Sequence, residues 1–238
     1  MGLELYLDLL SQPCRAVYIF AKKNNIPFTF KPVEVLKGEE GERFGKVNIL
    51  RRVPALKDGA FTLAESMAIL IYLSQKYKTP DHWYPSDIQR RARVDEYLSW
   101  QHVAIRANGV KLFWLKVVFP LFMDQLAPEE KLQEAFEDLA VSLKQLEEKF
   151  LQDKPFIAGN RISLADLVAI TELMQVGDGT WGRHSPYLNS LAMSKLPEHR
   201  EQSTPWVQTR RVLSHILLPV VLFIYYSFCF YTAPSCHR

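Results

Sequence analysis

The chain has 238 residues, 48% of them hydrophobic, which is enough to bury a core in one large domain or two small ones. Its 29 basic and 26 acidic residues leave a net charge of +3, which gives no case for a nucleic-acid partner. Three cysteines are too few for a disulfide framework and indicate a reducing compartment. Glu4 and Asp8 interrupt the first residues where a secretory signal would be apolar, so we expect a cytoplasmic protein.

The first 79 residues carry alternating strand and helix patterns. Apolar residues recur with period two in the strands and at helical spacing in the helices. Pro32 places its strand at a sheet edge or a bulge, and Asp58-Gly59 is typical of a hairpin turn. The expected elements are strands over 3–9 and 28–36, a helix over 14–24, a loop with a short helix over 37–48, a hairpin over 55–57 and 60–63, and a helix over 65–77.

Beyond residue 79 the character of the chain changes. Two prolines and no periodicity mark a linker over 80–87. Apolar residues at helical spacing then predict an all-helical domain over 88–175. Its helices are expected over 88–118, 128–151 and 163–174, the last opened by a capping box of Ser163 and Asp166.

The last segment, 176–238, begins without any period. Within it, residues 212–231 hold 16 apolar residues and no charged one. A helix of that length spans a bilayer, and Arg210-Arg211 suit the cytoplasmic side, so a membrane anchor is one interpretation. Pro219 and His215 favour the other interpretation, a buried helix or hydrophobic sequence derived from noncoding DNA.

Several strings together resemble the theta class of cytosolic glutathione transferases, from Met1 to about Gln175. They are MGLELYLDLLSQPCRAVYIFAKKN, VPALKDG, AESMAILIYLSQKY, DHWYPSD, RARVDEYLSWQH and FIAGNRISLADLVAITELMQ. The resemblance implies an α/β thioredoxin-like domain over 1–79 that binds glutathione, followed by the all-α domain. It also implies a homodimer that uses glutathione as co-substrate, with no other cofactor and no metal.

Ser11 and Cys14 stand one helical turn apart, where the first strand gives way to a helix. A serine there either caps the helix or uses the positive helix end to hold an anion. The resemblance implies that Ser11 donates to the sulfur of glutathione and lowers its thiol pKa, ~8.5 when free, by about one to two units. Cys14 is either a small core filler or a redox nucleophile, and we expect the filler because serine occupies the usual attacking position.

The remaining glutathione contacts also follow from the resemblance. Val53, in a loop that the family builds around a cis-proline, is expected to pair its backbone with the tripeptide. Glu65 and Ser66 are expected to meet the ammonium and carboxylate of the γ-glutamyl group. Glu65 alternatively only complements the helix dipole. Further expected ligands are Gln12, Arg52 and Glu40, and Arg106 is expected to line the electrophile pocket.

One departure from the family concerns the loop KGEEGER. Glu40 stands where the family often has a histidine facing the glycine carboxylate of glutathione. Two facing carboxylates repel unless Glu40 turns away or Lys37 or Arg43 covers it. We therefore predict weaker glutathione binding than in a relative with histidine there.

Three functions remain in competition. The resemblance predicts an enzyme that conjugates the glutathione thiolate to small electrophiles, or that reduces peroxides. The family closes its pocket with a C-terminal helix, which residues 176–238 replace, so a catalytically impaired binding or scaffold protein is the alternative. The third hypothesis is a thiol oxidoreductase that acts through Cys14.

Overall fold

A computed structural model describes residues 2–34 and 44–176. Glu40 and the apolar run 212–231 lie outside the described residues. Within the described part, no helix combines the length and the apolar composition needed to cross a membrane.

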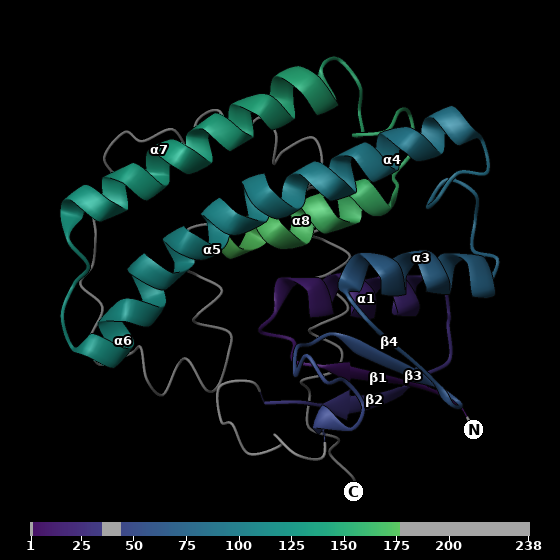
Figure 1. Ribbon diagram of the computed structural model, residues 1–238. Helices are drawn as coiled ribbons and strands as arrows, with labels where there is room; N and C mark the ends of the chain where they lie inside the picture. Colours follow the sequence, from purple (N-terminus) through teal and green to yellow (C-terminus); the bar gives the residue numbers. More distant parts are fainter. Residues whose placement is uncertain (1, 35–43, 177–238) are drawn as a thin grey trace, which may run out of the picture.

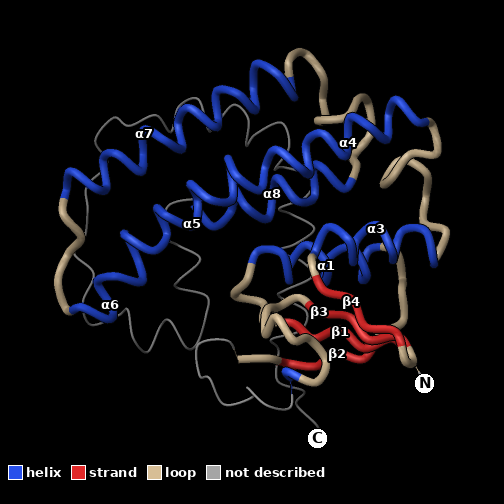
Figure 2. The backbone as a smooth tube through the Cα atoms, in the orientation of Figure 1, coloured by secondary structure: helices blue, strands red, loops and turns tan. Residues whose placement is uncertain are grey.

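The N-terminal half is built on a mixed four-stranded sheet (Figure 2). The strands lie in the order β2-β1-β3-β4, with β1 parallel to β2 and β3 antiparallel to both β1 and β4. Gly59 takes the left-handed φ of 65° that the β3–β4 turn requires, as its sequence predicts. The strands are β1 (Leu3–Leu7), β2 (Thr29–Pro32), β3 (Ala55–Asp58) and β4 (Phe61–Ala64).

β1 ends two residues earlier than its alternating pattern predicts. The Asp8 carboxylate accepts the N–H of Leu10 at 2.9 Å, and the Asp8 carbonyl accepts that of Ser11 at 3.0 Å. An aspartate that bonds the backbone two residues on favours a turn over an extended strand. The chain therefore turns at 8–11 and enters the first helix.

Two helices cover one face of the sheet. They are α1 (Gln12–Lys23) and α3 (Ser66–Lys76), and Figure 1 shows them between the sheet and the helical half of the molecule. Phe20 of α1 is fully buried and meets Trp83 edge to face, with ring centroids 5.4 Å apart. Trp83, within the predicted linker, thus packs against the N-terminal half.

The helical half consists of one long interrupted helix, a second long helix and a buried one. Figure 1 shows α7 and the α4–α6 helix running side by side. The predicted helix over 88–118 extends to Met123 and contains two π-helical turns that its hydrophobic periodicity did not predict. In chain order the elements are α4 (Ile88–Gln101), η1 (His102–Arg106), α5 (Ala107–Phe113), η2 (Trp114–Val118), α6 (Phe119–Met123), α7 (Glu129–Gln145), η3 (Leu146–Leu151) and α8 (Leu164–Val176).

The predicted capping box opens α8. The backbone N–H and the hydroxyl of Ser163 both donate to Asp166 Oδ2 at 2.8 Å, and the N–H of Ile157 donates to Oδ1 at 2.7 Å. Asp166 is 1% exposed, so these bonds satisfy polar groups that water does not reach. The carboxylate therefore ties the preceding loop to the start of α8.

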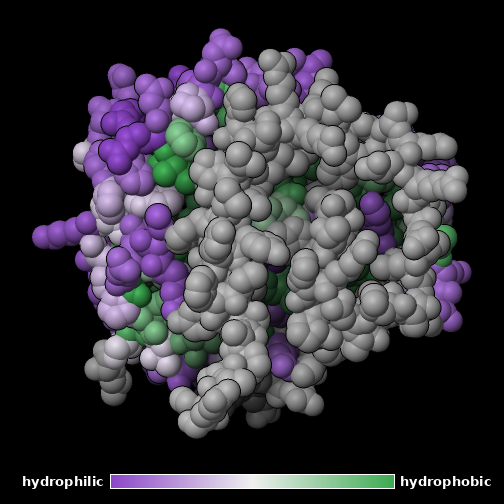
Figure 3. All heavy atoms as spheres, turned by 180° about the vertical axis from the view of Figure 1, so that it is seen from behind, coloured by the Kyte–Doolittle hydropathy of each residue, from purple (hydrophilic) through white to green (hydrophobic). Residues whose placement is uncertain are grey.

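The buried helix α8 joins the two halves. It packs against α1 of the N-terminal half and against α4 and α5 of the helical half. Of the described residues that are visible from behind, those at the left and top of the view are mostly hydrophilic, with smaller hydrophobic groups among them (Figure 3). α8 is therefore the helix through which the helical half contacts α1.

Candidate active site

Three segments that carry predicted site residues meet at one end of the sheet. In the register of the sheet, Tyr6 lies opposite Ala55, and Ala55 lies opposite Ala64. One step further along, the chain leaves β1 toward Ser11, enters β3 from Val53, and leaves β4 at Glu65. The topology therefore brings these three predicted residues to the same end of the sheet.

Ser11 is the N-cap residue of α1. Its backbone is extended, its side chain is half-buried, and its hydroxyl makes no capping hydrogen bond. The first turn of a helix offers unpaired N–H donors and a partial positive charge. Ser11 thus presents a hydroxyl that caps no backbone N–H of the helix and that contacts the Cys14 thiol, at an end of the helix that suits an anion.

Cys14 lies one turn further along α1 and is fully buried. Burial raises the pKa of its thiol from 9.0 to about 11, while hydrogen bonding from Ser11 and from the Asp8 backbone acts in the opposite direction. A thiol with this pKa stays protonated at neutral pH and is a poor nucleophile. These are the properties of a core filler.

The loop before β3 contains a cis peptide bond between Val53 and Pro54. Val53 is half-buried, and Arg52 is exposed. The Arg52 carbonyl accepts a hydrogen bond from Asn48 Nδ2 at 2.8 Å, which holds the loop from behind. Its guanidinium makes no ion pair with any residue in the described ranges, and so remains available to an anion.

Glu65 and Ser66 open α3. Glu65 is exposed, takes the left-handed φ of 67°, and makes no capping hydrogen bond with the helix. A non-glycine residue in this region is strained, and such strain concentrates at functional sites. Ser66 is 6% exposed and is the first residue of the helix. The two residues thus place a carboxylate and a helix N-terminus side by side.

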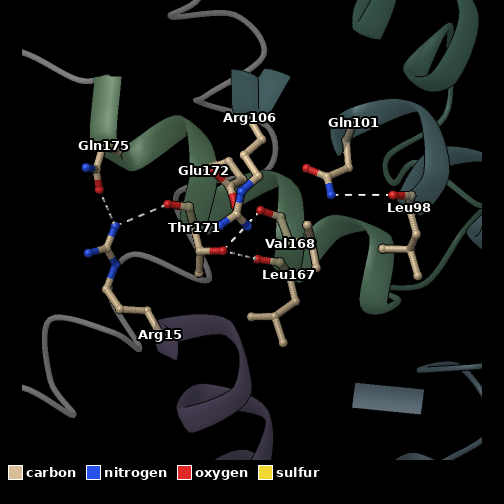
Figure 4. A network of polar contacts seen from close by, with 9 residues as sticks. All are labelled: Arg15, Leu98, Gln101, Arg106, Leu167, Val168, Thr171, Glu172 and Gln175. Carbon is tan, nitrogen blue, oxygen red and sulfur yellow. Dashed lines mark hydrogen bonds and ion pairs between the residues drawn. The ribbon is translucent and has the colours of Figure 1, made fainter. Parts of the chain in front are cut away.

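Two predicted site residues have buried surroundings. Gln12, the first residue of α1, is 6% exposed. Arg106, at the end of η1, donates from Nη1 to Glu172 Oε1 on α8 at 3.3 Å (Figure 4). Glu172 is 3% exposed, and its burial raises the pKa of the carboxyl, with Arg106 and then Arg15 opposing that shift.

Arg15 and Glu172 were not predicted as part of this site. Figure 4 shows Arg15 reaching from α1 toward α8, the helix that carries Glu172. The charges of Arg106 and Arg15 both act on the Glu172 carboxyl. Both had a sequence signal. A cation in the first turn of a helix opposes the helix dipole, and a glutamate inside an apolar helix needs a buried partner.

Residues 2–34 and 44–176 contain no cluster of three or more His, Cys, Asp or Glu side chains that would hold a metal ion. The groups at this end of the sheet are instead a hydroxyl, the backbone of a half-buried loop, a carboxylate and an exposed guanidinium. Such a set suits a peptide-like ligand that carries both charges.

Two family models match the chain. The N-terminal domain of glutathione S-transferase matches residues 5–81, and the C-terminal domain of glutathione S-transferase matches residues 113–178. Together they cover more than half of the chain. The chain therefore belongs to the glutathione S-transferase family of enzymes.

Curated relatives and solved structures show to which class of this family the chain is most similar. Glutathione S-transferase theta-1 of Gallus gallus is 62% identical over 200 residues, which is 75% of this chain and 77% of the relative. Human glutathione S-transferase T1-1 in its apo form gives a TM-score of 0.72 at 49% identity, covering 91% of this chain and 90% of that one. A human theta-class transferase in complex with the glutathione conjugate of 1-menaphthyl sulfate gives a TM-score of 0.71 at 42% identity, covering 92% of this chain and 99% of that one. Within the family these similarities place the chain in the theta class.

Proposed function

We propose that this chain conjugates glutathione to small electrophiles that carry a good leaving group. The thiol of bound glutathione loses its proton to solvent. A sulfur lone pair then forms a bond to the electrophilic carbon while the bond from that carbon to halide or sulfate breaks, and the leaving anion takes the bonding pair. The human relative bound to a conjugate of 1-menaphthyl sulfate supports a sulfate ester as one such electrophile.

The observation that carries this proposal is the row of three segments at one end of the sheet, next to the ends of β1, β3 and β4. From the end of β1 across β3 to the end of β4 is two strand spacings, about 10 Å. An extended tripeptide has a similar length, about 10 Å. The backbone of its central cysteinyl residue then runs along Val53, the cysteinyl side chain carries the sulfur toward Ser11, and the γ-glutamyl end reaches Glu65 and Ser66.

Each group in the row has a chemical role. The Ser11 hydroxyl and the helix end stabilise the thiolate, because both favour negative charge at the sulfur. The Glu65 carboxylate pairs with the ligand's ammonium, and the α3 N-terminus with Ser66 receives its α-carboxylate. Arg52 supplies the cation for the other carboxylate, and Gln12 supports the site beside Ser11. Arg106 lies toward the electrophile.

The wider predictions accompany this function. We infer a homodimer in the cytoplasm, with domains over 1–79 and 88–175 joined by the linker 80–87. Reduction of a peroxide is a further activity of the same thiolate: one sulfur attacks the peroxide oxygen, a second glutathione forms the disulfide, and the alcohol and water leave.

The scaffold alternative has one observation in its favour. The match to the theta-1 relative covers 75% of the chain, and the C-terminal family model stops at residue 178. The C-terminal family model therefore ends at the beginning of the segment 176–238, which the resemblance expects to replace the helix that covers the pocket. A pocket without its cover admits water and positions the electrophile less well.

A conjugation assay on the purified full-length chain tests the proposal. With glutathione and 1-menaphthyl sulfate, we expect release of sulfate that the Ser11→Ala variant largely loses. An exposed serine offers the matched control: Ser99→Ala, on the outer face of α4, should release sulfate at the wild-type rate. Glutathione binding without sulfate release in the wild type would favour the scaffold alternative.

A further inference from the structure

Arg15 connects the turn before α1 to the buried helix α8. Its Nη1 donates to the carbonyls of Leu9 at 3.1 Å and Leu10 at 2.9 Å. Its Nη2 donates to Gln175 Oε1 at 3.0 Å and to the Thr171 carbonyl at 3.4 Å (Figure 4). One guanidinium therefore serves four acceptors on two segments about 160 residues apart.

The turn that Arg15 holds is the one that carries the candidate catalytic serine. β1 ends at Leu7, and the carbonyls of Leu9 and Leu10 belong to neither the sheet nor α1. Partly buried carbonyls outside regular secondary structure still take a hydrogen-bond donor, and Arg15 provides it. Ser11 follows directly, and its own carbonyl accepts the N–H of Arg15 at 3.1 Å. Ser11 thus lies between two carbonyls that the Arg15 side chain binds and the first backbone hydrogen bond of α1.

We propose that Arg15 is a positioning residue for the thiolate site: it fixes the turn 8–11 against α8, so that the Ser11 hydroxyl faces the sulfur of glutathione. This inference rests on the proposed function. A planar guanidinium with its donors in a rigid fork can bond two segments at once, whereas a lysine ammonium on a flexible stem cannot reproduce that geometry. Arginine and lysine at position 15 should therefore differ, although their charges are the same.

The surroundings of Arg15 agree with a positioning role. Its charge lies in the first turn of α1, where the helix dipole is unfavourable to a cation. Burial lowers the pKa of the guanidinium, and the Glu172 carboxylate opposes that shift. Glu172, 3% exposed on α8, thereby compensates the charge next to the acceptors that Arg15 binds.

The pKa of the glutathione thiol in the binary complex tests the proposal. It is followed through the ultraviolet absorbance of the thiolate as pH rises, in the full-length chain. For Arg15→Lys we expect a pKa about one unit above that of the wild type, a tenfold lower ratio of thiolate to thiol at a given pH. The KM for glutathione should change far less than kcat, because the contacts at Val53 and Glu65 remain. Arg93→Lys, which alters an arginine with a 69% exposed side chain, is the matched control and should leave the pKa unchanged.

The outcomes separate this inference from the proposed function. A folded Arg15→Lys variant with the wild-type thiol pKa overturns the role of Arg15 alone. A wild-type chain whose bound glutathione keeps the free thiol pKa of ~8.5 overturns the proposed function itself. Where Arg15→Lys does not fold, Gln175→Leu decides, because it keeps Arg15 and its bonds to the carbonyls of Leu9 and Leu10 but weakens the attachment of the turn to α8. A raised thiol pKa supports the proposal, and an unchanged one overturns it.

Discussion

Arg106 and Glu172 form an ion pair across the inside of the helical half, with 3.3 Å between Nη1 and Oε1. The side chain of Arg106 is 26% exposed, whereas that of Glu172 is 3% exposed. The residue expected to face the electrophile is thus held by a carboxylate that water does not reach. Among the described residues, removing the arginine leaves that carboxylate with the smaller effect of the Arg15 charge to compensate it.

We predict that Arg106→Met lowers the free energy of unfolding by about 3 kcal/mol, the low end of the cost of a buried charge that has lost its partner, because the Arg106 side chain is 26% exposed. Denaturant titration measures it. Burial already raises the pKa of Glu172, so the folded state keeps that proton more tightly than the unfolded one. The loss should therefore be larger at neutral than at mildly acidic pH. Arg93→Met, which breaks an exposed pair with Glu96, should cost less than about 1 kcal/mol; equal losses for the two variants would contradict this account of Glu172.

Asp166 is expected to be essential to the folding of the helical half. Asp166→Ala leaves the buried N–H groups of Ile157 and Ser163 without acceptors, at about 1–3 kcal/mol each. We expect a loss of about 3 kcal/mol in the free energy of unfolding. Asp153→Ala, at an exposed position, should stay within about 0.5 kcal/mol of the wild type. Similar stabilities for the two variants would show that the capping box contributes little.

Cys14 gives a prediction for alkaline pH. Because its folded pKa is raised from 9.0 to about 11, the folded thiol stays protonated while the unfolded one ionises. Its contribution to stability is complete below pH 9.0 and is lost as pH rises toward about 11. Between these values the wild type should lose more stability than Cys14→Ala. Alkylation of the native protein at neutral pH, followed by peptide mass spectrometry, should leave Cys14 unlabelled; rapid labelling there would revive the oxidoreductase hypothesis.

Glu40 carries the one prediction that rests on the sequence alone. Glu40→His replaces a carboxylate with a neutral or cationic ring where the glycine carboxylate of glutathione is expected. We predict tighter glutathione binding, by about 1 kcal/mol or fivefold. Isothermal titration of both proteins measures the difference, and equal dissociation constants would dismiss the proposed repulsion.

The fold of the N-terminal half was largely predictable because its signals are local. Period-two alternation gave β1, Pro32 placed β2 at the sheet edge, and Asp58-Gly59 gave the hairpin. The capping box at Ser163 and Asp166 marked the start of α8. The early end of β1 and the π-helical turns escaped prediction, because both depend on hydrogen bonding and packing that hydrophobic periodicity does not encode.

The candidate site was less accessible to local reasoning. The cis bond before Pro54 followed only from the family resemblance, since most X-Pro bonds are trans. The bonds from Arg15 to α8 join residues about 160 positions apart, and no local pattern encodes such a pair. Arg15 at a helix start and Glu172 in an apolar helix each indicated that a partner is needed. The sequence did not indicate which residues these partners are.

The most direct measurement is the pKa of the glutathione thiol bound to the full-length wild type and to Ser11→Ala. If Ser11 holds the thiolate, the wild-type value lies about one to two units below that of free glutathione, ~8.5, and the variant returns close to the free value. The rate of conjugation at a pH below both values should fall in the same proportion, about 10-fold to 100-fold. Equal thiol pKa values in the two complexes would contradict the account.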